Sequence, residues 1–164
     1  MKNSSLVKSS ADALKKSANA LNNEALWEKK EDYDWDAITK AVKSFVDDYN
    51  SLVKLAGNSD SKDVLRNAVW MTGMTESNDN LLSKAGITVG KGNQMELNED
   101  ILKKADISTL KTLFTGHNSL ADKIATKANS ISNAAARTSG TYRNNGTYSN
   151  TLAELASSKV DEEV

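Results

Sequence analysis

Residues 35–57 read WDAITKAVKSFVDDYNSLVKLAG, and this stretch decides the fold. Its apolar side chains recur in alternating steps of three and four, at Trp35, Ile38, Val42, Phe45, Tyr49, Leu52 and Ala56. This spacing places them on one face of an α-helix, as in helices that pack along other helices. We expect Asp34 to cap the N-terminus and Gly57 to end the helix as a left-handed residue. The stretch therefore predicts one long helix of a helical bundle.

The same kind of periodicity continues on both sides of this helix. Before it, apolar residues take steps of four and three, and half of them are alanine, at Val7, Ala11, Leu14, Ala18, Leu21 and Ala25. After it, apolar patterns predict further helices at about residues 60–71, 76–85, 98–105 and 118–137. We expect the first helix to pair with the long second and last helices.

The apolar period changes from helical to alternating after Gly86. Residues 87–89 and 94–97 form two short alternating segments, joined by the glycine-rich residues 90–93. This pattern predicts a β-hairpin over about residues 87–97. A lone hairpin is only marginally stable in water, so its apolar residues must dock on helices. The predicted fold is therefore mainly α, an elongated antiparallel helical bundle with one docked β-hairpin.

The chain divides into a helical domain and a polar end. Residues 1–137 are expected to form one helical domain. Residues 138–151 are almost all Ser, Gly, Thr, Asn and Tyr and have no periodic apolar face, so residues 138–164 are predicted to be a polar flexible tail. Within it, a weak amphipathic pattern predicts a possible short terminal helix that docks on a partner, with Leu152, Leu155, Ala156 and Val160 on its apolar side.

The composition disfavours most catalytic and metal chemistry. The 164 residues include no Cys and one His, His117, so there is no thiolate ligand and no His pair for zinc. The acidic pairs at 47–48 and 99–100 suit a solvated helix face and a helix N-terminus better than a cation site. Residues 90–92 join two strands, whereas a phosphate loop leads into a helix. We expect no catalytic, cofactor-binding or metal-binding residues, and no enzyme activity.

The charge balance and the hydropathy point to a protein partner. The chain has 21 Lys and Arg against 22 Asp and Glu, a net charge of −1, which disfavours nucleic-acid binding. No apolar run is long enough to span a bilayer, and the start has no apolar signal core. The protein is thus expected to stay in the cytoplasm or to leave without a cleaved signal. Trp70 and Met74, with Leu152 and Leu155, are the predicted partner-binding residues.

Several short segments follow one another in an order that is typical of one protein family. They are Phe45-Val46 with Tyr49-Asn50, then Leu82, Ala85-Gly86-Ile87-Thr88, Gly92, Met95-Glu96-Leu97-Asn98-Glu99 and Ile101-Leu102-Lys103-Lys104-Ala105, then Leu113-Phe114 and Leu120-Ala121-Asp122-Lys123-Ile124. They resemble the Phe-Val-x-x-Tyr-Asn segment, the Gly-Ile hairpin and the capped helix of the flagellar filament-capping family, also called flagellar hook-associated protein 2. The resemblance covers about residues 34–140.

This resemblance implies a structural role. In that family the region forms the helical leg domain of an oligomeric cap, which sits at the filament tip and helps exported flagellin subunits to fold into place. It implies flagellar axial proteins such as flagellin, or a second copy, as partners, no catalytic residues, and an extracellular location reached without a cleaved signal. Family members insert a large head domain before the Phe-Val-x-x-Tyr-Asn helix, where this chain has the short charged segment 28–33.

A second interpretation follows from that missing head and from the absence of a signal sequence. The protein would then be a cytoplasmic helical adaptor or chaperone that binds a protein partner through Trp70, Met74 or the C-terminal segment. The heptad stripes suit contacts within one chain and between chains equally well, so the sequence leaves the oligomeric state open.

Overall fold

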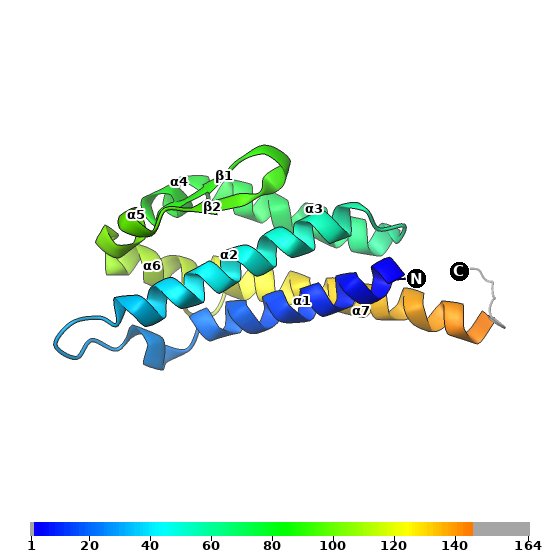
Figure 1. Cartoon of the computed structure of the whole chain (residues 1–164), viewed down its shortest axis with the longest axis horizontal. Coiled ribbons are helices and arrows are strands. Elements are labelled where there is room, and N and C mark those ends of the chain that lie inside the picture. The colour runs from blue at the N-terminus through cyan, green and yellow to red at the C-terminus, as the bar shows by residue number, and fades with distance from the viewer. Residues whose placement is uncertain (1, 146–164) are drawn as a thin grey trace.

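The structure is a computed structural model that describes residues 2–145. Four long helices lie along the longest dimension of the molecule (Figure 1), namely α1 (Lys2–Leu21), α2 (Trp35–Gly57), α3 (Lys62–Ser77) and α7 (Leu120–Asn145). Shorter elements complete it, namely η1 (Glu24–Trp27), α4 (Asp79–Lys84), β1 (Ile87–Val89), η2 (Lys91–Asn93), β2 (Met95–Leu97), α5 (Glu99–Lys104) and α6 (Ile107–Phe114). The prediction of a mainly α fold with one hairpin is confirmed.

The long helices form a closed four-helix bundle. α1 contacts both α2 and α7, and α3 also contacts both α2 and α7. Each contacting pair runs antiparallel, as the colour gradient in Figure 1 shows. The predicted pairing of the first helix with the second and last is therefore confirmed. The segment between α3 and α7, which holds the hairpin, lies over one part of α2 (Figure 1).

The predicted apolar stripes line the core of this bundle. Every member of the α2 stripe is fully buried except Trp35, which is half-buried. The stripe of α1 is buried in the same way, apart from Ala25, which lies beyond the end of α1. α7 adds a buried stripe of its own, formed by Ala121, Ile124, Ala128, Ile131 and Ala135. At one end, the Phe114 ring stacks on Trp27 with centroids 6.3 Å apart and meets Phe45 edge-on at 5.9 Å. Aromatic pairs in these geometries add stabilisation beyond the burial of their area.

Local signals set several element boundaries as expected. The Asp34 carboxylate accepts a hydrogen bond from the Ala37 N–H at 3.1 Å, and the Asn98 amide oxygen accepts one from the Ile101 N–H at 3.1 Å. The two strands pair antiparallel, with Ile87 opposite Leu97. The hairpin is thus present at its predicted position, and a capped helix follows it directly.

Three predicted helix ends in the first half of the chain are wrong at least in part. Gly57 is the last residue of α2 but is not left-handed, and the C-cap is Asn58 with a φ of −100°. α1 ends at Leu21, and the η1 turn then brings Trp27 back so that its indole N–H donates to the Leu21 carbonyl oxygen at 2.7 Å. α3 does not stop at Gly73 but continues to Ser77. Gly73 is exposed within the helix, while Thr75, two residues further along, is buried in the core. The burial of Thr75 outweighs the modest helix cost of one glycine.

The last helix is longer than predicted and passes the expected boundary at residue 137. α7 continues for eight residues beyond Arg137, to Asn145, the last residue that the structure describes. The Thr138 hydroxyl donates to the Ala134 carbonyl oxygen at 3.2 Å, so this polar residue is accommodated on the helix. Extending an existing helix adds one hydrogen bond per residue, and the chain has no proline to stop it. Residues 146–164, with Leu152, Leu155 and the predicted terminal helix, lie outside the described residues.

Candidate partner-binding site

The two predicted partner-binding residues on α3 have different surroundings. Trp70 is 61% exposed, whereas Met74 is half-buried and packs against the core. Trp70 has two exposed apolar neighbours on the same helix, Val69 at 69% and Leu65 at 36% exposure. Sequence reasoning assigned both of these to the apolar pattern of the helix and missed them as surface residues. The structure therefore groups Trp70 with Leu65 and Val69 rather than with Met74.

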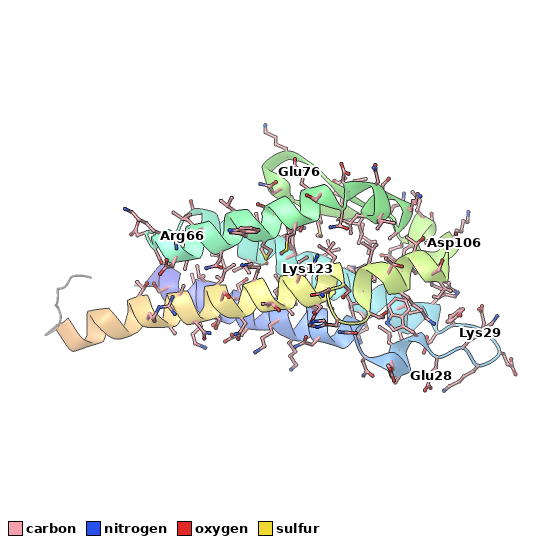
Figure 2. All side chains as sticks on the ribbon, turned by 180° about the vertical axis from the view of Figure 1, so that it is seen from behind. Glu28, Lys29, Arg66, Glu76, Asp106 and Lys123 are labelled. Carbon is pink, nitrogen blue, oxygen red and sulfur yellow. The ribbon has the colours of Figure 1, made fainter. Side chains whose placement is uncertain are left out.

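The position of α3 in the bundle explains this exposed group. Val64, Ala68 and Met71 point into the core. Successive helix residues are rotated by about 100° around the axis. Leu65, which follows Val64, and Val69, which follows Ala68, therefore face solvent. Leu65, Val69 and Trp70, with Lys62 and Arg66, line a shallow hollow on the outer face of the helix. We call these five residues the α3 patch. Figure 2 views the molecule from this side, with Arg66 labelled.

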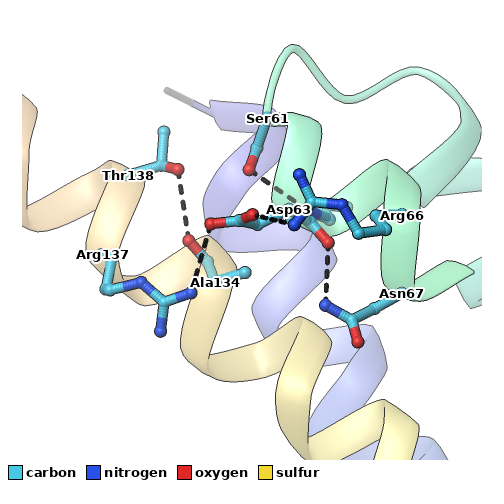
Figure 3. A network of polar contacts seen from close by, with 8 residues as sticks. Ser61, Asp63, Arg66, Asn67, Ala134, Arg137 and Thr138 are labelled. Atoms are coloured by element: carbon cyan, nitrogen blue, oxygen red, sulfur yellow. Dashed lines mark hydrogen bonds and ion pairs between the residues drawn. The ribbon is translucent and has the colours of Figure 1, made fainter. Parts of the chain in front are cut away.

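Positive charge borders the α3 patch. The Lys127 ammonium, on α7, lies 5.2 Å from the centroid of the Trp70 ring. A cation over an aromatic face is attracted by the ring quadrupole. The Asp63 carboxylate receives Arg66 at 2.8 Å and Arg137 at 3.6 Å, and so joins α3 to α7 beside the patch (Figure 3). This surface therefore has four cationic side chains, namely Lys62, Arg66, Lys127 and Arg137. Arg66 and Arg137 share the Asp63 carboxylate.

A second shallow groove runs between α1 and α2. Its lining is mostly small, from Ala13, Ser17, Ala20, Ala37, Ala41 and Ser44, with Lys16, Lys40 and Asp48 at its borders. Small side chains allow a helix to approach closely but bury little apolar area themselves. The groove is thus a less distinctive surface than the α3 patch, which has an aromatic ring and an arginine, the residue types enriched at interaction hot spots.

One polar side chain fixes the hairpin on α2. The Asn50 amide donates to the Met95 carbonyl oxygen at 2.9 Å and accepts from the Met95 N–H at 2.7 Å. Asn50 thus serves both backbone groups of one β2 residue, as a neighbouring strand would. The Gln94 amide adds a longer bond, 3.4 Å, to the Asn50 carbonyl oxygen. Sequence reasoning did not predict this contact, and the only available signal was an asparagine beside the buried stripe of α2.

Other titratable groups do not form a reactive arrangement in the described part of the chain. His117 is 88% exposed, and its Nδ1 lies 3.6 Å from an Asp122 carboxylate oxygen. No group of three or more His, Cys, Asp or Glu residues among those described is placed to hold a metal ion. The Asp12 carboxylate accepts a hydrogen bond from the Ser132 hydroxyl at 2.6 Å. This bond, with the neighbouring Lys8, lowers the pKa of Asp12 and links α1 to α7.

Tyr49 is the titratable group most affected by burial. Its ring is fully buried, and its hydroxyl has no hydrogen-bond partner within the described residues. Burial raises the pKa of Tyr49 to about 12 from its usual value of 10.0, because the phenolate would be desolvated. The Thr75 hydroxyl opposes this rise in pKa to a lesser extent. That hydroxyl donates its own proton to the Met71 carbonyl oxygen at 3.0 Å.

Alkaline pH should therefore destabilise the protein through Tyr49. A pKa that is higher in the folded state gives stability that is complete below pH 10 and is lost as pH rises toward 12. We expect Tyr49 to lower the free energy of unfolding by about 2 kcal/mol at pH 12. Tyr49→Phe removes an unsatisfied hydroxyl, so at pH 7 it should be neutral or stabilising by about 1 kcal/mol. Urea unfolding at several pH values measures both effects. An equal alkaline loss in Tyr49→Phe would contradict the assignment.

Comparisons with protein-family models, with curated proteins and with solved structures find no significant match to this chain. Among the described residues, no helix is both long and apolar enough to cross a membrane. The case for a functional site therefore rests on the geometry of the α3 patch and on the sequence resemblance.

Proposed function

We propose that this protein is a non-enzymatic structural or assembly protein that resembles the leg domain of the flagellar filament cap. It would act through helix-to-helix contacts with flagellar axial proteins such as flagellin, or with a second copy of itself. The observation that carries the proposal is the contact between Asn50 and Met95. These residues belong to two of the family-like segments and are 45 positions apart in the chain. The contact brings two of the segments that carry the resemblance together at one place in the fold, which supports the proposal.

The α3 patch supplies a contact surface for this role. Trp70 and Arg66 are of the residue types that dominate protein interfaces, and Val69 extends their apolar area. The proposed location is extracellular, in the bacterial flagellum. The composition supports export in an unfolded state, because a chain without Pro and Cys has no slow prolyl isomerisation and no stray disulfide after arrival.

Affinity capture of the full chain from a flagellated bacterium tests this proposal. We expect the tagged protein to recover flagellin, another axial protein or an untagged copy, and to reach the medium only when the flagellar export apparatus is intact. Trp70→Ser should weaken the recovered complex by about tenfold or more, since hot-spot truncation costs about 2 kcal/mol. Ile101→Ser is the matched control, because Ile101 is a 46% exposed apolar residue on α5.

The outcome also separates the alternative function. A cytoplasmic helical adaptor or chaperone would stay in the cell and would bind a non-axial partner through the same α3 patch. The exposed Trp70 and Val69 favour protein binding in either case. Recovery of no axial protein and no second copy, together with absence from the medium, would reject the flagellar proposal. Equal binding by Trp70→Ser would show that the α3 patch is not the contact surface.

A further inference from the structure

The α3 patch is an exposed apolar surface with a positive border. These two properties favour an occupant that is apolar and negatively charged. Its centre is formed by Leu65, Val69 and Trp70, which are 36%, 69% and 61% exposed. Lys62 and Arg66 line the hollow, and Lys127 lies over the Trp70 ring. A matching occupant has a short apolar stripe with carboxylates beside it.

One segment of this chain has that chemistry. Residues 152–163 read LAELASSKVDEE and place apolar side chains at helical spacing, at Leu152, Leu155, Ala156 and Val160. They also include four carboxylates against one lysine, at Glu154, Asp161, Glu162, Glu163 and Lys159. We propose that residues 152–163 dock on the α3 patch of the same molecule and cover Trp70, so that a partner must displace them. The proposal rests on the proposed use of the patch as a contact surface.

The position of α7 brings this segment within reach. α7 packs antiparallel against α3, and the ion pair between Arg137 and Asp63 sets their relative position (Figure 3). Asn145 lies eight residues beyond Arg137, which is about 12 Å further along the helix. The six residues 146–151 span up to about 20 Å when extended. The chain can therefore turn back, pass Asp63 and reach Leu65.

The direction of return also places the opposite charges together. A chain that turns back from the end of α7 runs parallel to α3, so Leu152 comes first, near Leu65, and the acidic residues 161–163 come last. The far end of the patch is where Trp70 and Lys127 lie. Carboxylates near this cation gain a favourable Coulomb interaction that added salt weakens. Apolar contact at the start and charge pairing at the end would hold the segment in one direction.

Paramagnetic NMR on the full chain tests this docking. The sequence has no Cys, so Ser158→Cys gives one site for a nitroxide label. The three Trp indole signals are separate probes, because Trp70 lies on the patch while Trp27 and Trp35 belong to the far end of the bundle, where η1 ends and α2 begins (Figure 1). We expect the label to broaden the Trp70 indole and the Leu65 and Val69 amides severalfold, and to leave Trp27 and Trp35 unchanged.

Two further samples make the result decisive. Adding Leu152→Ser and Leu155→Ser to the labelled chain should restore the Trp70 signal. Mixing labelled chain with isotope-enriched chain that has no label should give no broadening of Trp70. Broadening in that mixture would identify the segment of a second copy as the occupant and overturn the intramolecular proposal. An unbroadened Trp70 in the labelled chain would overturn docking altogether. These NMR samples contain no flagellar partner, so their outcome tests the docking of residues 152–163 independently of the proposed function.

Discussion

Replacing Gly86 by alanine is expected to destabilise the protein by about 2–5 kcal/mol. Gly86 has a φ of +86°, a left-handed conformation that costs an alanine free energy. An added Cβ would also lie 2.6 Å from the Asn98 carbonyl oxygen and 2.9 Å from the Leu102 nitrogen. Both are backbone atoms and cannot rotate away. The Asn98 N–H donates to the Gly86 carbonyl oxygen at 2.7 Å, so the substitution would separate α4, the hairpin and α5.

Gly73→Ala is the matched control for this prediction. Gly73 lies on the exposed side of α3, and an added Cβ there would meet nothing within 4 Å. Because alanine has the higher helix propensity, this control should stabilise the protein by about 0.5–1 kcal/mol. Urea unfolding followed by circular dichroism gives both values. A Gly86→Ala protein as stable as the parent would show that α4 and α5 do not approach as closely as described.

Asn50→Ala is expected to lower the free energy of unfolding by about 2–4 kcal/mol. The substitution removes two hydrogen bonds, 2.9 and 2.7 Å long, from the two backbone groups of Met95. The Met95 residue is 2% exposed, so its N–H and C=O would have little water to replace them. A two-stranded hairpin is marginally stable without support, so the loss should concentrate in the hairpin.

Hydrogen exchange locates this effect. The Met95 amide should exchange faster in Asn50→Ala by a larger factor than the amides of α1. The control is Asn67→Ala on α3, where the amide donates to the Asp63 carbonyl oxygen of its own helix, at 2.9 Å. That control should change stability by no more than about 0.5 kcal/mol. Unchanged Met95 protection in Asn50→Ala would contradict the role of Asn50.

Local patterns predicted much of the fold. The stripe of α2, the strands at 87–89 and 95–97, and the caps at Asp34 and Asn98 depend on residues within a few positions of each other. Spacing and side-chain chemistry over such distances are visible in a sequence. The boundaries were less predictable, because burial of Thr75 carries α3 past Gly73, and α7 runs past Arg137 through residues with no apolar period.

The partner-binding residues, like the fold, were predicted only in part from the sequence. Trp70 was predicted to bind a partner, and its side chain is 61% exposed. Met74, the other predicted residue on α3, is half-buried and packs against the core, and the prediction did not include Leu65 or Val69. Whether Trp70 binds a partner stays a prediction. The cation over its ring comes from Lys127, 57 positions later in the chain, and no local pattern predicts such a pair.

The sequence by itself determined which residues share a helix face and where the hairpin forms. The tertiary structure alone decided which faces are covered, because burial depends on the neighbouring elements and not on the helix that bears the residue. It placed Asn50 against Met95 and left Leu65, Val69 and Trp70 in solvent beside Lys127. Periodicity defines a face, but only packing determines whether that face belongs to the core or is open to a partner.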